Sequence, residues 1–295
     1  MFGISRGDNG KFTVELKEST EYFDAIILAT GSKADGHEFA QTLGHTIVKP
    51  VPSLFTLNTK HQVKEGGMLH GLSGISVPTA RLTFKVDVEG KKKKQVVFQE
   101  GPLLVTHNGI SGPATLRLSA FGARQFHQAN YRGNVFVHWA PELGSAEEVT
   151  AMLWDCKATM PKRAVSTSCP LVLSEQLSAI PRRLWAAMVT ESGFEKETTW
   201  NEAPKKKVGA LARMVSECVL DVTGKSVFKD EFVTAGGVSL KEIDMKSMES
   251  KKCPGLFLCG EVIDVDGVTG GFNFMNCWST GYTAGSGAAE YVAAN

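Results

Sequence analysis

The stretch that decides the fold is CPGLFLCGEVIDVDGVTGGFNFMNCWSTGYTAGSGAAEYV, residues 253–292. It opens with GLFLCG, a short apolar strand that ends at Gly260. Three acids come next, Glu261, Asp264 and Asp266, and then a glycine-rich turn, Thr269-Gly270-Gly271-Phe272-Asn273, begins a helix. Open α/β sheets bind their ligands at the carboxyl ends of parallel strands. The stretch therefore predicts a ligand site at the point where the strand gives way to the helix.

The chemistry of this turn favours a hydroxylated cofactor with an electron-rich ring. Carboxylates at a strand tip accept hydrogen bonds from sugar-like hydroxyls, as the acid of a dinucleotide site does. Paired glycines let a ligand approach the main chain, and a helix N-terminus stabilises negative charge. A flavin fits, because its N1–C2=O2 edge gains negative charge on reduction. Two alternatives stay open: a plain strand–turn–helix packed by glycines, and a calcium loop at Asp264–Gly267, which lacks the EF-hand spacing.

Behind the turn, small residues repeat every four positions at Gly281, Gly285 and Ala289. This repeat predicts one bare helix face that sits close against a strand or a ligand.

The front of the chain supports the same kind of site. Residues 11–16, KFTVEL, read as a strand, and a second strand, YFDAIILATG, is expected over residues 22–31. Its centre is continuously apolar, which is typical of a strand covered on both faces of a parallel sheet. Gly31 ends it and permits close approach of a ligand to the backbone. A short helix is expected over residues 35–45.

Composition sets the limits of class and partners. The chain has 295 residues, a net charge of +1 and 42% hydrophobic residues, as expected of a soluble globular protein. Neither nucleic acid nor a membrane surface is indicated as a partner by this charge. The N-terminus lacks the apolar segment of a signal peptide. The six cysteines are scattered, so we expect no metal site and a reducing compartment, the cytoplasm or an organelle stroma or matrix.

The pattern of apolar, polar and turn residues changes three times along the chain. Short alternating runs with turn residues follow residue 47, including VDVEGKKKKQVVF, a hairpin with Lys91–Lys94 at a solvated tip. Helical spacing dominates residues 145–219, and strand and helix return near the end. The order α/β, β, α, α/β predicts a parallel-sheet domain that is interrupted by a long insertion.

Nearly the whole chain resembles the BaiN-like, or aminoacetone-oxidase-type, family of FAD-dependent oxidoreductases. The matching segments are AIILATG, LGHTIVKPVPSL, GPLLVTHNGISGPATLRLS, IPRRL, FVTAGGVSLKEID, MESKKCPGLFLCGEVIDVDGVTGGFN and WSTGYTAG. The resemblance implies an α/β fold of the FAD/NAD(P)-binding, two-dinucleotide-domain type. It divides the chain into FAD-domain parts at 1–47 and 229–295, an inserted β-barrel at 48–144 and an inserted helical unit at 145–228.

The same resemblance implies roles for particular residues. Thr30 and Gly31 would lie along the FAD, and Gly260, Glu261 and Asp264 would meet its ribityl and pyrophosphate region. Thr269, Gly270, Gly271, Phe272 and Asn273 would face the isoalloxazine edge. NAD(P)H is the expected co-substrate, and the other substrate is an unidentified small molecule.

The segment THNGISGP, residues 106–113, is a hallmark of the family without a derivable role. Ser111 is expected to cap a helix with Pro113 in its first turn. His107 is a weak candidate for a catalytic residue, since a lone histidine is more often structural. No general base stands out.

The chain departs from the family at its front. Members of the family begin with a strand and a G-x-G-x-x-G turn, and this sequence has no such turn. Members also usually have a glycine- and serine-rich stretch that is missing here between Ser32 and Asp35. We therefore expect an N-terminally incomplete member with an exposed apolar sheet edge and face, which a partner would cover. FAD binding by this chain alone is expected to be weak or absent.

Three functions follow. The first is an FAD-dependent oxidoreductase that passes a hydride between a nicotinamide and an organic substrate. The second is a non-catalytic remnant that acts as an interaction module. The third and weakest is a tRNA-modifying flavoprotein, against which the near-neutral charge and the lack of a basic and aromatic face argue.

Overall fold

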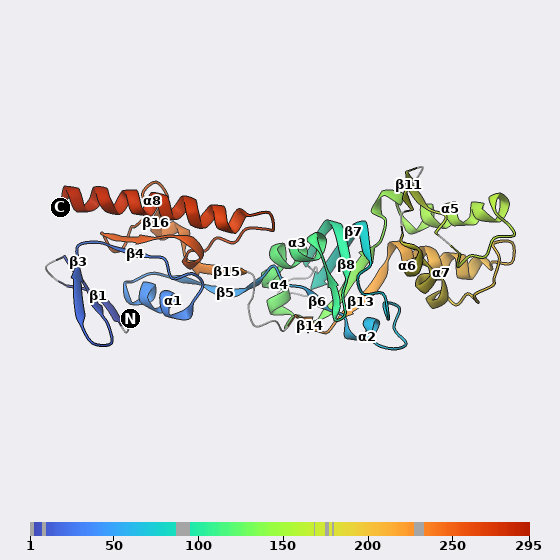
Figure 1. Ribbon diagram of the computed structural model, residues 1–295, viewed down its shortest axis with the longest axis horizontal. Helices are drawn as coiled ribbons and strands as arrows, with labels where there is room; N and C mark the ends of the chain where they lie inside the picture. The colour runs from blue at the N-terminus through green and yellow to red at the C-terminus, as the bar shows by residue number, and fades with distance from the viewer. Residues whose placement is uncertain are drawn as a thin grey trace. The chain divides into compact units, whose positions relative to one another are not determined.

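The computed structural model describes residues 3–7, 10–86, 95–167, 169–174, 177–178, 180–226 and 233–295. The chain forms two compact units, which Figure 1 shows. Unit 1 consists of residues 1–54 and 230–295, and unit 2 of residues 55–229. The structure thus divides the chain at 54/55 and 229/230, where the sequence predicted 47/48 and 228/229. Lys91–Lys94 lie outside the described residues.

Unit 1 contains three sheets, one long helix and one shorter helix. Its strands are β1 (Gly3–Arg6), β2 (Phe12–Glu15), β3 (Thr20–Phe23), β4 (Ile26–Leu28), β5 (Ile47–Ser53), β15 (Val233–Val238), β16 (Ile243–Asp244), β17 (Glu249–Ser250) and β18 (Leu256–Leu258). Its helices are α1 (Ala34–Thr42), α8 (Phe272–Ala294) and the 3-10 turns η2 (Leu240–Glu242) and η3 (Gly260–Val262). β1, β2 and β3 form a meander, and β5 pairs with β15.

The sheet that carries the predicted site has the order β16-β17-β18-β4. β18 pairs with β4 in parallel, and the register matches Leu256 to Ile26 and Leu258 to Leu28. Leu256, Phe257 and Leu258 are fully buried, whereas Ile27 of β4 is 42% exposed. The sequence predicted that the apolar strand within residues 22–31 is covered on both faces, and this prediction was wrong, because that strand is β4. The predicted strand over residues 22–31 is also divided, because Asp24 and Ala25 separate β3 from β4.

Helix α8 packs along β18, β17 and β4 (Figure 1). Gly287 makes the close approach, because a Cβ added there would lie 2.6 Å from the Ser247 carbonyl oxygen. A Cβ added at Gly281 or Gly285 would meet no described atom within 4 Å. The bare face at Gly281, Gly285 and Ala289 was expected to sit against a strand or a ligand. The strand alternative was wrong, since Ala284 and Gly287 are the residues of α8 that are buried, and the ligand alternative stays a prediction.

Unit 2 combines one large antiparallel sheet with a group of helices. Its strands are β6 (Leu57–Asn58), β7 (Ser76–Val86), β8 (Gln95–Val105), β9 (Gly109–Ser111), β10 (Gly133–His138), β11 (Val172–Ser174), β12 (Leu177–Ser178), β13 (Cys218–Val222) and β14 (Gly224–Lys225). Its helices are α2 (Lys60–Val63), α3 (Pro113–Phe121), α4 (Ala123–Gln128), α5 (Ala146–Thr159), α6 (Arg182–Glu191), α7 (Lys205–Ser216) and the 3-10 turn η1 (Pro141–Leu143).

The large sheet has the order β13-β10-β7-β8-β9-β6-β14. Its two end strands are separated by Thr223 alone in the chain, so the sheet curls round towards itself. α3 begins at Pro113, as expected, but its N-cap is Gly112 at φ +92° rather than Ser111, which belongs to β9. Ser111 could not cap the helix because the chain turns sharply at Gly112 before the first helical residue.

Candidate functional site

The predicted site lies where β4 and β18 end side by side in unit 1. Their parallel pairing continues to the strand tips, where the Cys259 amide donates a hydrogen bond to the Leu28 carbonyl oxygen at 3.2 Å. The segments that follow, residues 29–31 and 259–261, therefore leave the sheet at the same edge. This is the carboxyl edge of the parallel pair, where α/β folds bind ligands.

A pocket of about 470 Å³ opens at the start of α8. It is lined by Val233, Glu261, Val268, Thr269, Gly270, Gly271, Asn273, Phe274 and Cys277. Five of these residues were predicted from the sequence: Glu261, Thr269, Gly270, Gly271 and Asn273. Ligand sites commonly have volumes of about 300–1,000 Å³, so the pocket has room for a ring system.

The start of α8 supplies main-chain donors to this pocket. Gly271 is the N-cap residue in the left-handed conformation at φ +86°, and among the described residues no side chain caps the helix. The first turn contains no acidic residue that would compensate the positive end of the helix dipole. The free N–H groups and the dipole therefore favour an electron-rich or anionic group of a ligand.

Two side chains hold the turn in shape. The Asn273 side-chain amide donates to the Gly267 carbonyl oxygen at 3.0 Å and accepts from the Gly267 amide at 2.7 Å. Asp266 accepts a hydrogen bond of 2.9 Å from the Ser53 hydroxyl. Asn273 lines the pocket, but its amide is occupied by the main chain, so its role is to close the loop before the helix.

The other predicted residues are not part of its lining: Thr30, Gly31, Gly260, Asp264 and Phe272. The Gly260 amide donates to the Thr280 hydroxyl at 2.9 Å, which ties the β18 tip to α8. The Thr30 hydroxyl is buried and has no hydrogen-bond partner in the part of the chain that the structure describes. The hydroxyl packs against Gly36 of α1, where it leaves no room for a Cβ, so it faces that helix and is closed to a ligand.

Cys277 is a pocket residue that the sequence analysis missed. Burial raises the pKa of its thiol, and the nearby Glu261 carboxylate raises it further. Cys277 follows Asn273 by four residues, so helical periodicity alone places both on one side of α8. That spacing was the available signal.

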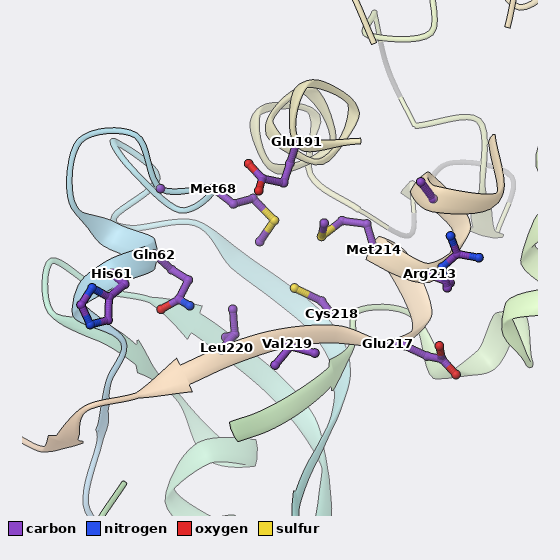
Figure 2. Close-up of a pocket in the computed structure, with 12 residues that line it drawn as sticks. His61, Gln62, Met68, Glu191, Arg213, Met214, Glu217, Cys218, Val219 and Leu220 are labelled. Carbon is purple, nitrogen blue, oxygen red and sulfur yellow. The ribbon is translucent and has the colours of Figure 1, made fainter. Parts of the chain in front are cut away.

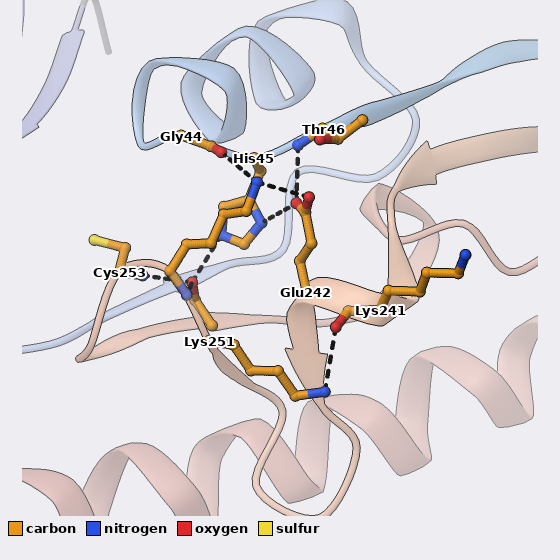
Figure 3. Close-up of polar contacts among 9 residues, drawn as sticks. Gly44, His45, Thr46, Lys241, Glu242, Lys251 and Cys253 are labelled. Carbon is orange, nitrogen blue, oxygen red and sulfur yellow. Dashed lines mark hydrogen bonds and ion pairs between the residues drawn. The ribbon is translucent and has the colours of Figure 1, made fainter.

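A second cluster of polar side chains lies elsewhere in unit 1, around His45 (Figure 3). His45 Nε2 lies 2.8 Å from the Ser250 hydroxyl, and its Nδ1 lies 3.2 Å from Glu242 Oε2. The order serine, histidine, acid resembles a hydrolytic triad. However, Ser250 is 4% exposed, and its hydroxyl accepts the amides of Lys252 and Cys253. No substrate reaches this hydroxyl, so the cluster is structural.

Unit 2 has a pocket of its own of about 510 Å³ (Figure 2). Its lining comes from α2 and the turn after it, from α6, and from α7 and β13 with the residue between them, and the side chains of Met68, Met214 and Cys218 point into it. Burial raises the pKa of Cys218 to about 12, so its thiol stays protonated and is a poor nucleophile. His107 lies exposed in the turn between β8 and β9, and its catalytic role stays a prediction.

Two kinds of feature are missing from the part of the chain that the structure describes. Among them, no helix is both long and apolar enough to cross a membrane. No group of three or more histidine, cysteine, aspartate or glutamate side chains within the described ranges could hold a metal ion.

Comparison with known proteins gives a match over most of the chain. A family model described as the HI0933-like protein Rossmann domain matches residues 1–287. A Clostridium scindens protein named 3-dehydro-bile acid delta(4,6)-reductase is 27% identical over 281 residues, covering 90% of this chain and 62% of its own length.

Two further relatives are named ribosomal RNA dihydrouridine synthase. The Haemophilus influenzae protein is 28% identical, covering 95% of this chain and 64% of its own length. The Escherichia coli protein is 26% identical, covering 100% of this chain and 67% of its own length. The chain thus spans about two thirds of the length of the curated relatives it matches.

Proposed function

Because the chain belongs to the HI0933-like Rossmann family, we propose that the pocket at the start of α8 holds the isoalloxazine ring of FAD. The family match confirms the resemblance and the FAD/NAD(P)-binding type of fold that the sequence predicted. Together with the reductase relative it supports an oxidoreductase of FAD type. The observation that carries the proposal is the convergence of uncapped α8 amides, paired glycines and Glu261 on one pocket.

The residues fit one edge of a flavin. Gly270 and Gly271 let the ring approach the main chain, and the first α8 amides would stabilise the charge that its N1–C2=O2 edge gains. Glu261, at the tip of β18, would accept a hydrogen bond from a ribityl hydroxyl or from water on a phosphate. Thr30 and Gly31, which follow β4, would lie along the same cofactor. When bound, the flavin supplies the hydride chemistry.

The substrate class is suggested by the names of the relatives. A delta(4,6)-reductase and a dihydrouridine synthase are both named for adding hydrogen to a carbon–carbon double bond. We therefore propose that the substrate of this site is an organic molecule with a reducible double bond, and that NAD(P)H supplies the hydride.

A second candidate function is reduction of a base in RNA, which two of the relatives' names favour. The net charge of +1 gives this chain little general attraction for RNA. A small-molecule substrate therefore remains the first choice. If the chain slows the migration of RNA in a gel at moderate salt, RNA becomes the preferred substrate over a small molecule.

We also propose that residues 1–295 alone bind FAD weakly. The described pocket would line one edge of the ring, and the sequence contains no G-x-G-x-x-G turn to hold the pyrophosphate of the ADP group. Titration of the desalted protein with FAD, followed by flavin fluorescence, tests both proposals. Weak, saturable binding that disappears in Gly271→Val but persists in Gly224→Val, a control glycine in unit 2, is expected.

Two results would contradict the proposals. Stoichiometric flavin retained through desalting would contradict weak binding, although it would leave the site intact. Binding that is equal in wild type and Gly271→Val, or undetectable at millimolar FAD, would overturn the flavin site itself.

A further inference from the structure

The pocket of unit 2 gathers the sulfur atoms of three residues that come from separate segments of the chain. Met68 lies in the turn after α2, Met214 in the last turn of α7 and Cys218 at the start of β13. Figure 2 shows the two methionine side chains reaching towards each other and the Cys218 sulfur directed into the same space. The pocket is therefore lined by two thioethers and one thiol that converge.

Main-chain contacts fix the segments that carry these sulfurs. The Leu69 amide donates a hydrogen bond to the Gln62 carbonyl oxygen at 2.8 Å, which closes the turn that carries Met68. Cys218 pairs with Val137 of β10 in the large sheet, and the other methionine is held by α7. The wall of the pocket is thus formed by the fold of unit 2 and does not need a ligand to assemble it.

The choice of sulfur at these positions indicates the class of ligand. Leucine fills nearly the same volume as methionine, so apolar packing alone does not require a thioether. Thioethers and thiolates are soft ligands that select Cu(I), whereas zinc sites use thiolate, imidazole or carboxylate. A group with two thioethers does not appear when only histidine, cysteine, aspartate and glutamate are considered as ligands. The ligand set therefore favours Cu(I).

The burial of the thiol favours a monovalent ion. Cys218 is 4% exposed, and an uncompensated charge at such a position is costly. When Cu(I) binds, the S–H bond breaks, a sulfur–copper bond forms and the proton leaves to water, so the thiolate and the ion together stay neutral. A divalent ion on the same three ligands would leave one positive charge, which burial disfavours.

Trp139 supplies an independent observation at the same sulfur. The residue is fully buried, and its indole N–H has no hydrogen-bond partner in the part of the chain that the structure describes. Burial raises the pKa of Cys218, and the Trp139 indole opposes this effect by favouring the thiolate. The N–H is therefore placed to donate to a thiolate that copper binding would create, and such donors commonly support metal ligands.

We propose that Met68, Met214 and Cys218 form a binding site for one Cu(I) ion. Both methionines are half-buried, so an ion can reach them from solvent. The sequence prediction of no metal site considered the scattered cysteines, whereas this site combines one cysteine with methionines. The inference does not depend on flavin binding.

Titration of the reduced chain with Cu(I) under anaerobic conditions, in competition with bicinchoninate, tests the proposal. One tightly bound ion is expected in the wild type. Met214→Leu keeps the side-chain volume and removes the sulfur, so the affinity should fall by about tenfold or more. Trp139→Phe keeps an aromatic ring, removes the N–H and should weaken binding by about tenfold. X-ray absorption at the copper edge should count three sulfur neighbours in the wild type and two in Met214→Leu.

Matched controls remove the same groups elsewhere in unit 2. Met188→Leu alters a fully buried methionine of α6, and Cys156→Ala removes a thiol of α5 that is 5% exposed, so neither should change the affinity. Urea unfolding verifies that each variant is folded, and the half-buried position of Met214 makes its variant the decisive one. The proposal is overturned if the wild type loses all copper to bicinchoninate or if Met214→Leu binds as tightly as the wild type. A loss of affinity in Cys156→Ala would also overturn it, because the ion would then lie at another thiol.

Discussion

Glu242 is the group on which the acid stability of unit 1 should depend most. Its Oε2 accepts the Thr46 amide at 2.9 Å and faces His45, and its Oε1 lies 2.7 Å from Lys252 Nζ. Burial alone would raise the pKa of this carboxyl, but the hydrogen bonds from Lys252 and Thr46 outweigh burial and lower its pKa to about 2. The contacts with His45 and Thr46 join residues nearly 200 positions apart in the sequence.

The size of the effect follows from linkage. Lowering the pKa of a carboxyl from 4.5 to about 2 corresponds to about 3 kcal/mol of stability, as an upper value. Because the folded-state pKa is depressed, this stability is present above pH 4.5 and is lost as the pH falls towards 2. Burial also lowers the pKa of His45, so the folded state disfavours its charged form. A smaller loss should therefore begin below pH 6.5.

The perturbation is Glu242→Gln, which keeps the shape and removes the charge. The rates of hydrogen exchange at the β5 and β15 amides, corrected for the intrinsic effect of pH, measure the stability of unit 1 separately from that of unit 2. At pH 7 the variant should lose about 1–3 kcal/mol of protection. Between pH 4.5 and 2 its protection should depend less on pH than that of the wild type.

The matched control is Glu38→Gln, an exposed position of α1 in the same unit, which should behave as the wild type. The reasoning is refuted if Glu242→Gln is within about 0.5 kcal/mol of the wild type at pH 7, the usual range for surface substitutions. It is equally refuted if the variant keeps the full loss of protection between pH 4.5 and 2.

Two further predictions concern α8. Gly287→Ala should destabilise unit 1 by more than about 1 kcal/mol, since its Cβ would collide with the Ser247 carbonyl. Gly281→Ala, where the added Cβ meets open space, should be neutral or stabilising, and urea unfolding of both variants measures the difference. Cys277 should react with N-ethylmaleimide more slowly than a free thiol at pH 7, because burial and Glu261 raise its pKa. Glu261→Gln should speed that reaction, as measured by mass spectrometry, and an unchanged rate would show that the carboxylate does not act on the thiol.

Local patterns in the sequence located the elements that carry the site. The apolar run before Gly260 and the glycine pair before Phe272 are readable without tertiary information, and both appear as β18 and the start of α8. The cluster of His45, Glu242 and Ser250 was not readable, because its members are isolated polar residues in three separate segments. Only the paired strands bring those segments together.

The glycines of α8 show where periodicity stops being informative. A four-residue repeat identifies a bare face, but it does not say which face meets the sheet when both faces are apolar. The sequence prediction placed Gly281, Gly285 and Ala289 against a strand or a ligand, whereas the close contact with the sheet is made at Gly287. A charged outer face would have removed the ambiguity by marking the solvent side. The absence of that mark on α8 is therefore the feature that misled the sequence prediction.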